Sequence, residues 1–176
     1  MDFEAPVDAW VVWVGVVFVG IALTGVALAL PSQPPPDATG AANTIDRVAG
    51  STHVAGASYE HDAEEVRIDT NRLSMRNDGR VAHASVAFGS LTPVHAVENE
   101  TRREVFERLL DGEHPSSVLD DDEYDSLSEP VLRETATETR ARLASDDSGP
   151  DWRPADGRLR VRTVELDGSE VVLVAV

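Results

Sequence analysis

The chain of 176 residues contains no cysteine. Disulfide bonds, thiolate metal sites, a cysteine nucleophile and a lipidated N-terminal cysteine are therefore excluded. Lysine is absent as well, because all 15 basic residues are arginine. These arginines form no basic stripe or tail that would neutralise phosphates, so the sequence predicts that nucleic acid is not a partner.

Acidic residues are in large excess, with 32 Asp and Glu and a net charge of −17. Setting aside Asp2, Glu4 and Asp8, the chain after residue 30 holds 29 acids against 15 arginines, a net charge of −14. This pattern is typical of proteins from extreme halophiles, because at molar salt the Debye length is only about 3 Å and self-repulsion is screened. We therefore expect low salt to destabilise the protein. The alternative, a cation site or a surface for a basic partner, is less favoured because the acids are dispersed.

Residues 9–30 form the longest apolar run, with 22 positions and no charge. As a helix this run would be about 33 Å long, which matches the hydrocarbon core of a bilayer. It has no polar face, and Trp10 and Trp13 lie at one end, where aromatic rings favour the headgroup level. The sequence thus predicts that residues 1–30 are a transmembrane anchor whose partner is the lipid bilayer.

A cleaved secretory signal is the alternative interpretation, since Ala27-Leu28-Ala29 has the small-x-small form of a cleavage site. However, the first eight residues carry no positive charge, and the apolar run is longer than the roughly 7–15 residues of a signal peptide. A retained anchor is therefore favoured.

Small residues recur in the apolar run at spacings that would let two such helices approach closely. They are Gly20, Thr24, Gly25 and Ala29. The alternative is that Gly and Ala are simply common in membrane helices. The positive-inside rule gives little information on sidedness, because the first basic residue is Arg47. Asn99-Glu100-Thr101 is a candidate glycosylation sequon and favours an extracytoplasmic head.

Proline marks the next segment. Pro31 would end the helix, and Pro34, Pro35 and Pro36 favour a stiff polyproline stretch. Residues 31–43 are therefore predicted to be a linker that separates the anchor from an acidic head of residues 44–176. Residues 44–49 are expected to form a short helix ending at Gly50.

The head combines strand and helix patterns. Alternating apolar residues predict two or three strands between residues 53 and 88, with a hairpin at Asn77-Asp78-Gly79, and a second hairpin turns at Asp167-Gly168. Residues 97–110 predict an amphipathic helix, Pro130 begins another that runs to about Ser145, and residues 111–128 predict a loop or single turn. The apolar segment 171–176 is expected to be a central strand. Strands followed by helices and then strands indicate an α+β fold, with a small antiparallel sheet and two or three packed helices.

No motif for catalysis or metal binding is present. The histidines lack metal-ligand spacing, and the acidic run 120–125 lacks the glycine and the final glutamate of an EF-hand loop. Gly89-Ser90 and Ser116-Ser117 do not form a nucleophile elbow, and no phosphate-binding glycine loop occurs. Glu107 and Glu123 are a candidate acid–base pair, but any acidic protein offers such pairs. The sequence predicts no cofactor, no metal and no enzyme activity. The five histidines are His53, His61, His83, His95 and His114.

The segment FEAPVDAWVVWVGVVFVGIALTGVALALPSQPPPD, the helix IDRVA and the hairpin MRNDGRVAHA resemble a family of uncharacterised haloarchaeal single-pass membrane proteins, a domain of unknown function. The resemblance implies an accessory or pilin-like role, because members are often encoded beside type IV pilus-like or secretion-like ATPases and membrane platforms. Two features depart from a pilin: no basic leader precedes residue 9, and the proline run interrupts the helix. For the same reason Glu4 is not equated with the pilin glutamate.

Together these patterns predict a noncatalytic, membrane-anchored surface protein that binds another protein of such an assembly. An anchored extracytoplasmic module that binds a ligand or acts as a sensor is the alternative, with its ligand unknown.

Overall fold

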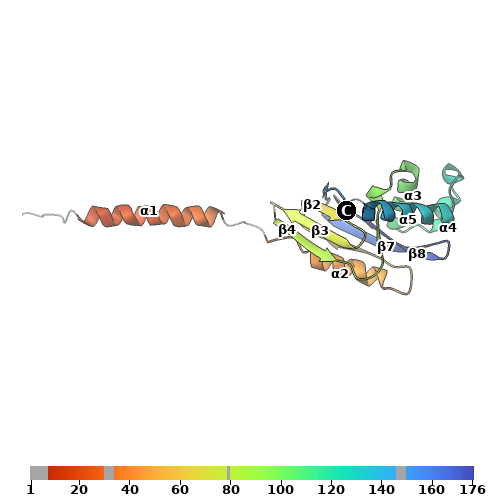
Figure 1. The fold of residues 1–176 in the computed structure, drawn as a ribbon, viewed down its shortest axis with the longest axis horizontal. Coiled ribbons are helices and arrows are strands. Elements are labelled where there is room, and N and C mark those ends of the chain that lie inside the picture. Colours follow the sequence, from red (N-terminus) through yellow and green to blue (C-terminus); the bar gives the residue numbers. More distant parts are fainter. Residues whose placement is uncertain (1–7, 30–33, 79, 146–149) are drawn as a thin grey trace, which may run out of the picture. The chain divides into compact units, whose positions relative to one another are not determined.

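The computed structural model describes residues 8–29, 34–78, 80–145 and 150–176. The chain divides into two compact units, residues 1–34 and residues 35–176. Figure 1 draws both, and the second unit is called the head below.

The first unit contains the helix α1 (Asp8–Ala29), close to the predicted 9–30. Its described side chains are those of Trp10 and residues 12–25, and all of them are exposed. The Thr24 hydroxyl donates a hydrogen bond of 2.8 Å to the carbonyl of Gly20, so this polar group is satisfied within the helix. Within the part of the chain that the structure describes, no helix is both long and apolar enough to cross a membrane.

The head begins with α2 (Ala38–Ala49), which is longer than predicted. The side chain of Asp37 caps it by accepting a hydrogen bond of 2.8 Å from the Gly40 N–H, and Gly50 follows its last turn as expected. Ala38, Ala41 and Ala42 are buried, so residues 38–43 belong to the head and not to the predicted linker. The prediction started the helix too late because small residues such as alanine give no amphipathic signal.

The described strands of the head form two four-stranded sheets, where a single sheet was predicted. The first has the order β1-β7-β8-β5 and the second the order β4-β3-β2-β6. The strands of the first are β1 (Gly56–Glu60), β7 (Arg158–Leu166), β8 (Ser169–Ala175) and β5 (Leu91–Pro93). Those of the second are β4 (Arg80–Ser85), β3 (Arg72–Asn77), β2 (Glu65–Ile68) and β6 (Arg153–Pro154).

Both predicted hairpins are confirmed. Asp78 lies in the turn between β3 and β4 with a φ of 43°, and Asp167 and Gly168 join β7 to β8 with φ of 51° and 70°. Two-residue turns of this kind need positive φ, which Asp and Gly tolerate better than most residues. The fold is therefore α+β with largely antiparallel sheets. β5 is an exception, because it pairs with β8 in parallel.

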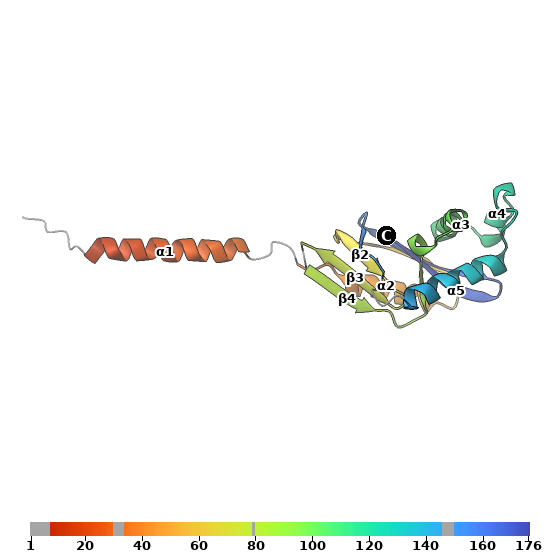
Figure 2. The ribbon, with the colours of Figure 1, turned by 45° about the horizontal axis from the view of Figure 1, so that its top comes forward.

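The described residues of the head also form four α-helices and two 3₁₀ turns. Residues 111–128 are more helical than expected. Besides α2, the helices are α3 (Glu100–Asp111), α4 (Pro115–Leu119) and α5 (Glu129–Ser145), and the turns are η1 (Val94–Ala96) and η2 (Asp122–Tyr124). Figures 1 and 2 show α3, α4 and α5 grouped beside the hairpin of β7 and β8, away from β3 and β4.

The first sheet separates two hydrophobic cores. One core lies between α2 and inner faces of both sheets and includes Ile45 and Met75. The other lies under α3, α4 and α5 and includes Phe106 and Leu132. β8 serves both, because Val172 and Val174 point into the first core and Leu173 into the second. Burial on both faces explains why this strand is continuously apolar and central, as predicted.

The Asp46 carboxylate ties α2 to the segment after β4. Its Oδ1 accepts hydrogen bonds of 2.8 and 2.9 Å from the backbone N–H groups of Ala87 and Phe88. We expect Asp46→Ala to lower the free energy of unfolding by about 1–3 kcal/mol, because hydrogen bonds to a charged acceptor are lost.

Asp46→Asn keeps an acceptor oxygen and should lose less, and the exposed Asn43→Ala on the same helix is the control. Urea unfolding at molar salt measures the effect. Equal stability of Asp46→Ala and Asn43→Ala would contradict this role of Asp46.

Candidate functional site

The residues predicted for the anchor do not pack against other side chains of α1. The exposed fractions of Trp10 and Trp13 are 61% and 70%, and a Cβ added at Gly20 or Gly25 would meet nothing within 4 Å. Their roles in a membrane or in helix pairing stay predictions. The side chain of Ala29 lies outside the described residues.

Asn99 is exposed and caps α3. Its Oδ1 accepts a hydrogen bond of 3.0 Å from the Arg102 N–H. The side-chain nitrogen, to which an N-linked glycan would attach, takes no part in that bond. The structural role of Asn99 as a cap therefore leaves the sequon accessible.

The five histidines are spread over the head. His53 and His83 are exposed, His61 and His95 are partly buried, and His114 is the N-cap of α4. Among the described residues, no group of three or more His, Asp or Glu side chains is arranged to hold a metal ion.

Arg108 ties the acidic run 120–125 to α3. Arg108 forms ion pairs of 2.6 Å with Glu113 and 3.2 Å with Asp121, and its guanidinium lies 5.6 Å from the ring centre of Tyr124. Tyr124 is 1% exposed and belongs to the second core. The loop predicted for residues 111–128 gave no sign that Tyr124 is buried, because its sequence neighbours are acidic.

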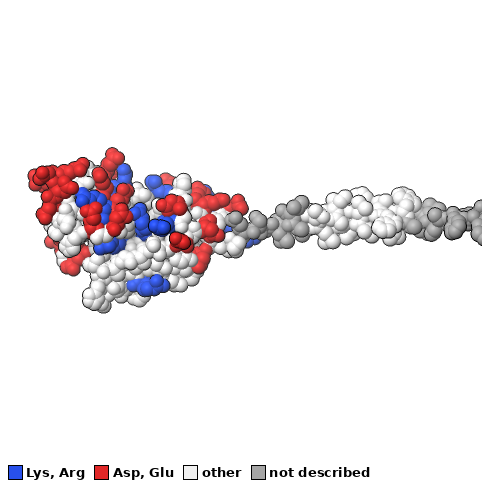
Figure 3. Space-filling model, turned by 180° about the vertical axis from the view of Figure 1, so that it is seen from behind, with Lys and Arg blue, Asp and Glu red and all other residues white. Residues whose placement is uncertain are grey.

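Acidic side chains are concentrated around this part of the head. Residues 98–125 hold 11 Asp and Glu against three arginines. Figure 3 shows acidic groups crowding one end of the head, with arginines between them nearer its middle. The acids of this segment are thus concentrated both in the sequence and on one part of the head.

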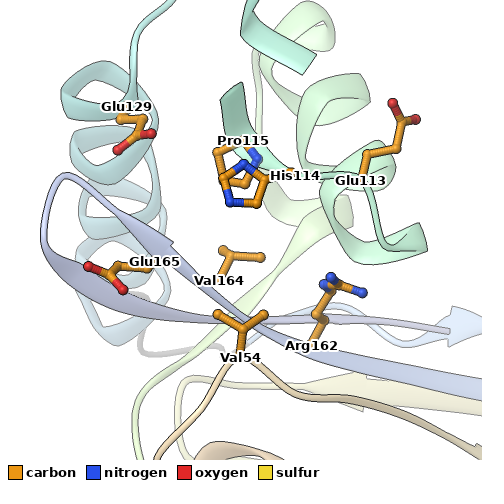
Figure 4. Close-up of a pocket in the computed structure, with 8 residues that line it drawn as sticks. All are labelled: Val54, Glu113, His114, Pro115, Glu129, Arg162, Val164 and Glu165. Carbon is orange, nitrogen blue, oxygen red and sulfur yellow. The ribbon is translucent and has the colours of Figure 1, made fainter. Parts of the chain in front are cut away.

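A cavity of about 260 Å³ opens between the second half of β7 and the starts of α4 and α5. Figure 4 shows His114 at its centre, Glu129 and Glu165 on one side, and Arg162 on the other. His114 Nδ1 lies 2.9 Å from the Ser116 hydroxyl, and a Glu129 carboxylate oxygen accepts a bond of 2.9 Å from the Asp167 N–H. Val54, Glu113, Pro115 and Val164 complete the lining.

The cavity brings one histidine within hydrogen-bond reach of one hydroxyl, that of Ser116. Nucleophilic and acid–base catalysis both require a base within hydrogen-bond reach of its partner. Among the described residues, no hydrogen bond joins His114 to a carboxylate. The lining contains three carboxylates and one arginine, and the Glu113 carboxylate is paired with Arg108. Val54, Pro115 and Val164 add an apolar part to the same cavity.

Three arginines alternate along β7, in the segment Arg-Leu-Arg-Val-Arg. Arg158, Arg160 and Arg162 share one face of the strand, because alternate side chains point the same way. Arg160 pairs with Asp111, and an Arg162 nitrogen donates a bond of 3.2 Å to the Gly112 carbonyl. A groove of about 360 Å³ runs from these arginines to β1. The alternate spacing of these arginines is visible in the sequence and could have predicted a charged face on this strand.

A second cluster of arginines stacks on Trp152. The guanidiniums of Arg67 and Arg76 lie 5.0 and 4.6 Å from the centre of its ring, and Arg76 also pairs with Glu65. These residues come from β2, β3 and the segment before β6. No local pattern could predict the cluster, because it depends on pairing of distant strands.

His95 lies in a cleft beside Arg103, Arg142 and Arg153. Burial, together with the charge of Arg153, lowers the pKa of His95 from 6.5 to about 4. Arg142 forms an ion pair of 2.5 Å with Glu98 at the same cleft. His95 is therefore neutral near neutral pH and serves as a packed, uncharged side chain.

Comparison with known proteins gives one match. Residues 4–164 match a family of unknown function, DUF7283. The chain belongs to this family. The match spans α1 and most of the head, and the resemblance to an uncharacterised domain is thereby confirmed. No curated protein and no solved structure matches the chain.

The lowered pKa of His95 predicts a dependence of stability on pH. Because the folded pKa lies below the unfolded one, the unfolded state binds the proton first, and stability is lost as pH falls from about 6.5 to about 4. His95→Gln removes this titration. The acid-induced fall in unfolding free energy should therefore be smaller in the variant, by on the order of 1–3 kcal/mol.

Denaturant unfolding of both proteins between pH 7 and pH 4 measures the difference, in which the titration of the carboxylates cancels. Parallel stability curves for the two proteins would contradict the buried, neutral state of His95.

Proposed function

We propose that this protein is a noncatalytic, membrane-anchored surface protein whose head binds another protein of a pilus-like or secretion-like membrane assembly. Residues 9–30 lie in the bilayer and the head lies outside the cytoplasm. The pilin-like accessory role and the haloarchaeal origin are part of the same proposal.

The apolar helix is the observation that carries the proposal. Taken by itself, α1 exposes its large apolar side chains all round, with exposed fractions of 64% for Ile21, 68% for Phe18 and 70% for Trp13. A helix without a polar face needs an apolar solvent or an apolar partner. The 22 uncharged residues 9–30 have the length that hydrocarbon requires. The proposed anchor thus rests on two observations. One is the sequence of residues 9–30, and the other is the exposure of the described side chains of α1.

The head supports a role in binding rather than catalysis. It buries its own apolar residues in two cores, so it does not need α1 to complete them. Its cavities are open and lined by mixed charges, and among the described residues no carboxylate is hydrogen-bonded to His114, whose ring nitrogen lies 2.9 Å from the Ser116 hydroxyl. Surfaces of this kind suit protein contacts that are fixed by charge and shape.

An anchored ligand-binding or sensory module is the second candidate, favoured by the cavity around His114. Its lining combines Val54 and Val164 with a few convergent polar groups, as small-molecule sites do. Its volume, about 260 Å³, falls slightly below the usual range of about 300–1,000 Å³ for ligand sites.

Affinity purification from detergent-solubilised membranes at molar salt tests the proposal. We expect the tagged full-length chain to recover further membrane proteins of an assembly, and to lose them when Glu129 and Glu165 are both changed to Gln at the His114 cavity. Glu138→Gln, at an exposed position on α5, is the control. Recovery of the protein alone would contradict the proposed role in an assembly.

Sidedness has its own test. Protease added to intact cells should digest the head but not cytoplasmic proteins. A glycan at Asn99 would add mass that Thr101→Ala removes, while the Asn99 cap of α3 stays in place. A head that resists protease until the cells are lysed would contradict an extracytoplasmic location.

A further inference from the structure

The edges of the two sheets differ in how they are protected. Exposed edge strands tend to pair with other chains unless they are short, covered, charged or interrupted by proline. β5 is buried and ends at Pro93, and β6 has only two residues, one of which is Pro154. β1 and β4 are longer, with five and six residues, and each lies at the end of its sheet.

The backbone of β1 presents unpaired groups on its outer side. The carbonyl of Ala55 accepts the Thr163 N–H, and the His61 N–H donates to the carbonyl of Gly157, so odd-numbered residues face β7. Gly56, Ser58 and Glu60 therefore direct their N–H and C=O groups away from the sheet. All three residues are exposed. A strand of a neighbouring chain could therefore extend the first sheet by pairing with β1.

We propose that β1 pairs antiparallel with β1 of a second copy of this chain, about a two-fold axis at Ser58. Ser58 then lies opposite its counterpart, and Gly56 lies opposite Glu60 of the other copy. In an antiparallel ladder, each of these pairs exchanges two backbone hydrogen bonds. The result is a continuous sheet across two heads, with an isologous interface.

Charge complementarity favours this register. Gly56 lies opposite Arg162 in the pairing of β1 with β7, and Glu60 of the second copy would lie on the other side of Gly56. Strands two apart are separated by about 10 Å, a distance that Arg and Glu side chains together span. Because Gly56 has no side chain, it leaves the space between Arg162 and Glu60 of the second copy open. The Glu60 side chain is 85% exposed and makes one long ion pair, of 3.9 Å, with Arg158 of its own chain. Arg162 donates to the Gly112 carbonyl and makes no ion pair among the described residues.

β4 offers no such complementarity. Its outward residues would be Val81, His83 and Ser85, since Val86 donates to the Asn71 carbonyl across β3. Self-pairing about His83 would place two histidines opposite each other. The strand contains no carboxylate, and its neighbour β3 contributes Arg72 and Arg76 on the outer face. Pairing through β1 is therefore favoured over pairing through β4.

The geometry also suits two anchors in one membrane, a point that rests on the proposed function. A two-fold axis normal to the joined sheet places both α2 helices on the same face. Tyr59 in β1 donates a hydrogen bond of 2.9 Å to Asp37, the cap of α2. The beginning of each head therefore lies close to β1 and to the proposed axis at Ser58. Shared membrane residence would raise the effective concentration of a weak contact.

Cross-linking through a single cysteine tests the pairing, because the native chain has no cysteine. In full-length protein in membranes at molar salt, Ser58→Cys should form a disulfide dimer on mild oxidation. Directly opposed residues have Cα atoms about 5.5 Å apart, within the range of a disulfide. Ser85→Cys is the matched control, an exposed serine with an outward N–H on β4.

We expect at least about tenfold more dimer from Ser58→Cys than from Ser85→Cys, since only position 58 lies on the proposed axis. Equal yields would overturn the proposal. A cross-linked product with the mass of a different protein would also overturn it, because it would identify another occupant of the edge.

Charge reversal provides the second arm. In the Ser58→Cys background, Glu60→Arg should reduce the dimer several-fold because the direct contact of Glu60 with Arg162 of the other copy is lost, and Glu60→Arg with Arg162→Glu should restore it. Lack of restoration in a folded double variant would contradict the register. Sedimentation of the same samples reports membrane association separately, so failure of the pairing is distinguishable from failure of the anchor.

Discussion

The burial of β8 on both faces is the interaction on which the head depends. Its side chains alternate between the core beneath α2 and the core beneath α3, α4 and α5. Each core alone would leave one face of the first sheet exposed to water. The continuously apolar part of β8, residues 171–175, is stable only between two such layers, so the chain needs both its early helix and its late helices to complete one sheet.

This arrangement explains where the charged groups lie. Apolar residues fill the two cores, and Asp, Glu and Arg are left on helix surfaces, on the outer face of the second sheet and along the uncovered half of β7. Arginine is used structurally: Arg108 ties the acidic run to Tyr124, and Arg67 and Arg76 hold Trp152 against the second sheet. These contacts fix the positions of the acidic run and of Trp152 on the head.

Local features were predictable from the sequence. The turn at Asp167-Gly168, the helix that begins beside Pro130 and the amphipathic stripe of α3 depend on neighbouring residues, whose conformational preferences act over a few positions. Non-local features were not predictable. The division into two sheets and the parallel pairing of β5 with β8 join segments about 80 residues apart, as the register of Leu91 with Val172 shows. Nothing in either segment alone specifies its partner.

The candidate site follows the same rule. His114, Glu129 and Arg162 meet at one cavity only because α4, α5 and β7 pack together, and Tyr124 is buried despite its acidic neighbours. By contrast, the apolar run that defines the anchor is visible in one stretch of sequence. The surfaces of the head could be described only from the structure. The proposed anchor rests on the sequence of residues 9–30.

Fractionation of the native chain tests the anchor most directly. After lysis and ultracentrifugation, the protein should stay with the membranes through high-salt and alkaline washes and be released by detergent, and its intact mass should include residues 9–30. A chain that remains in the supernatant without detergent, or a mature product that begins near Leu30, would contradict the account.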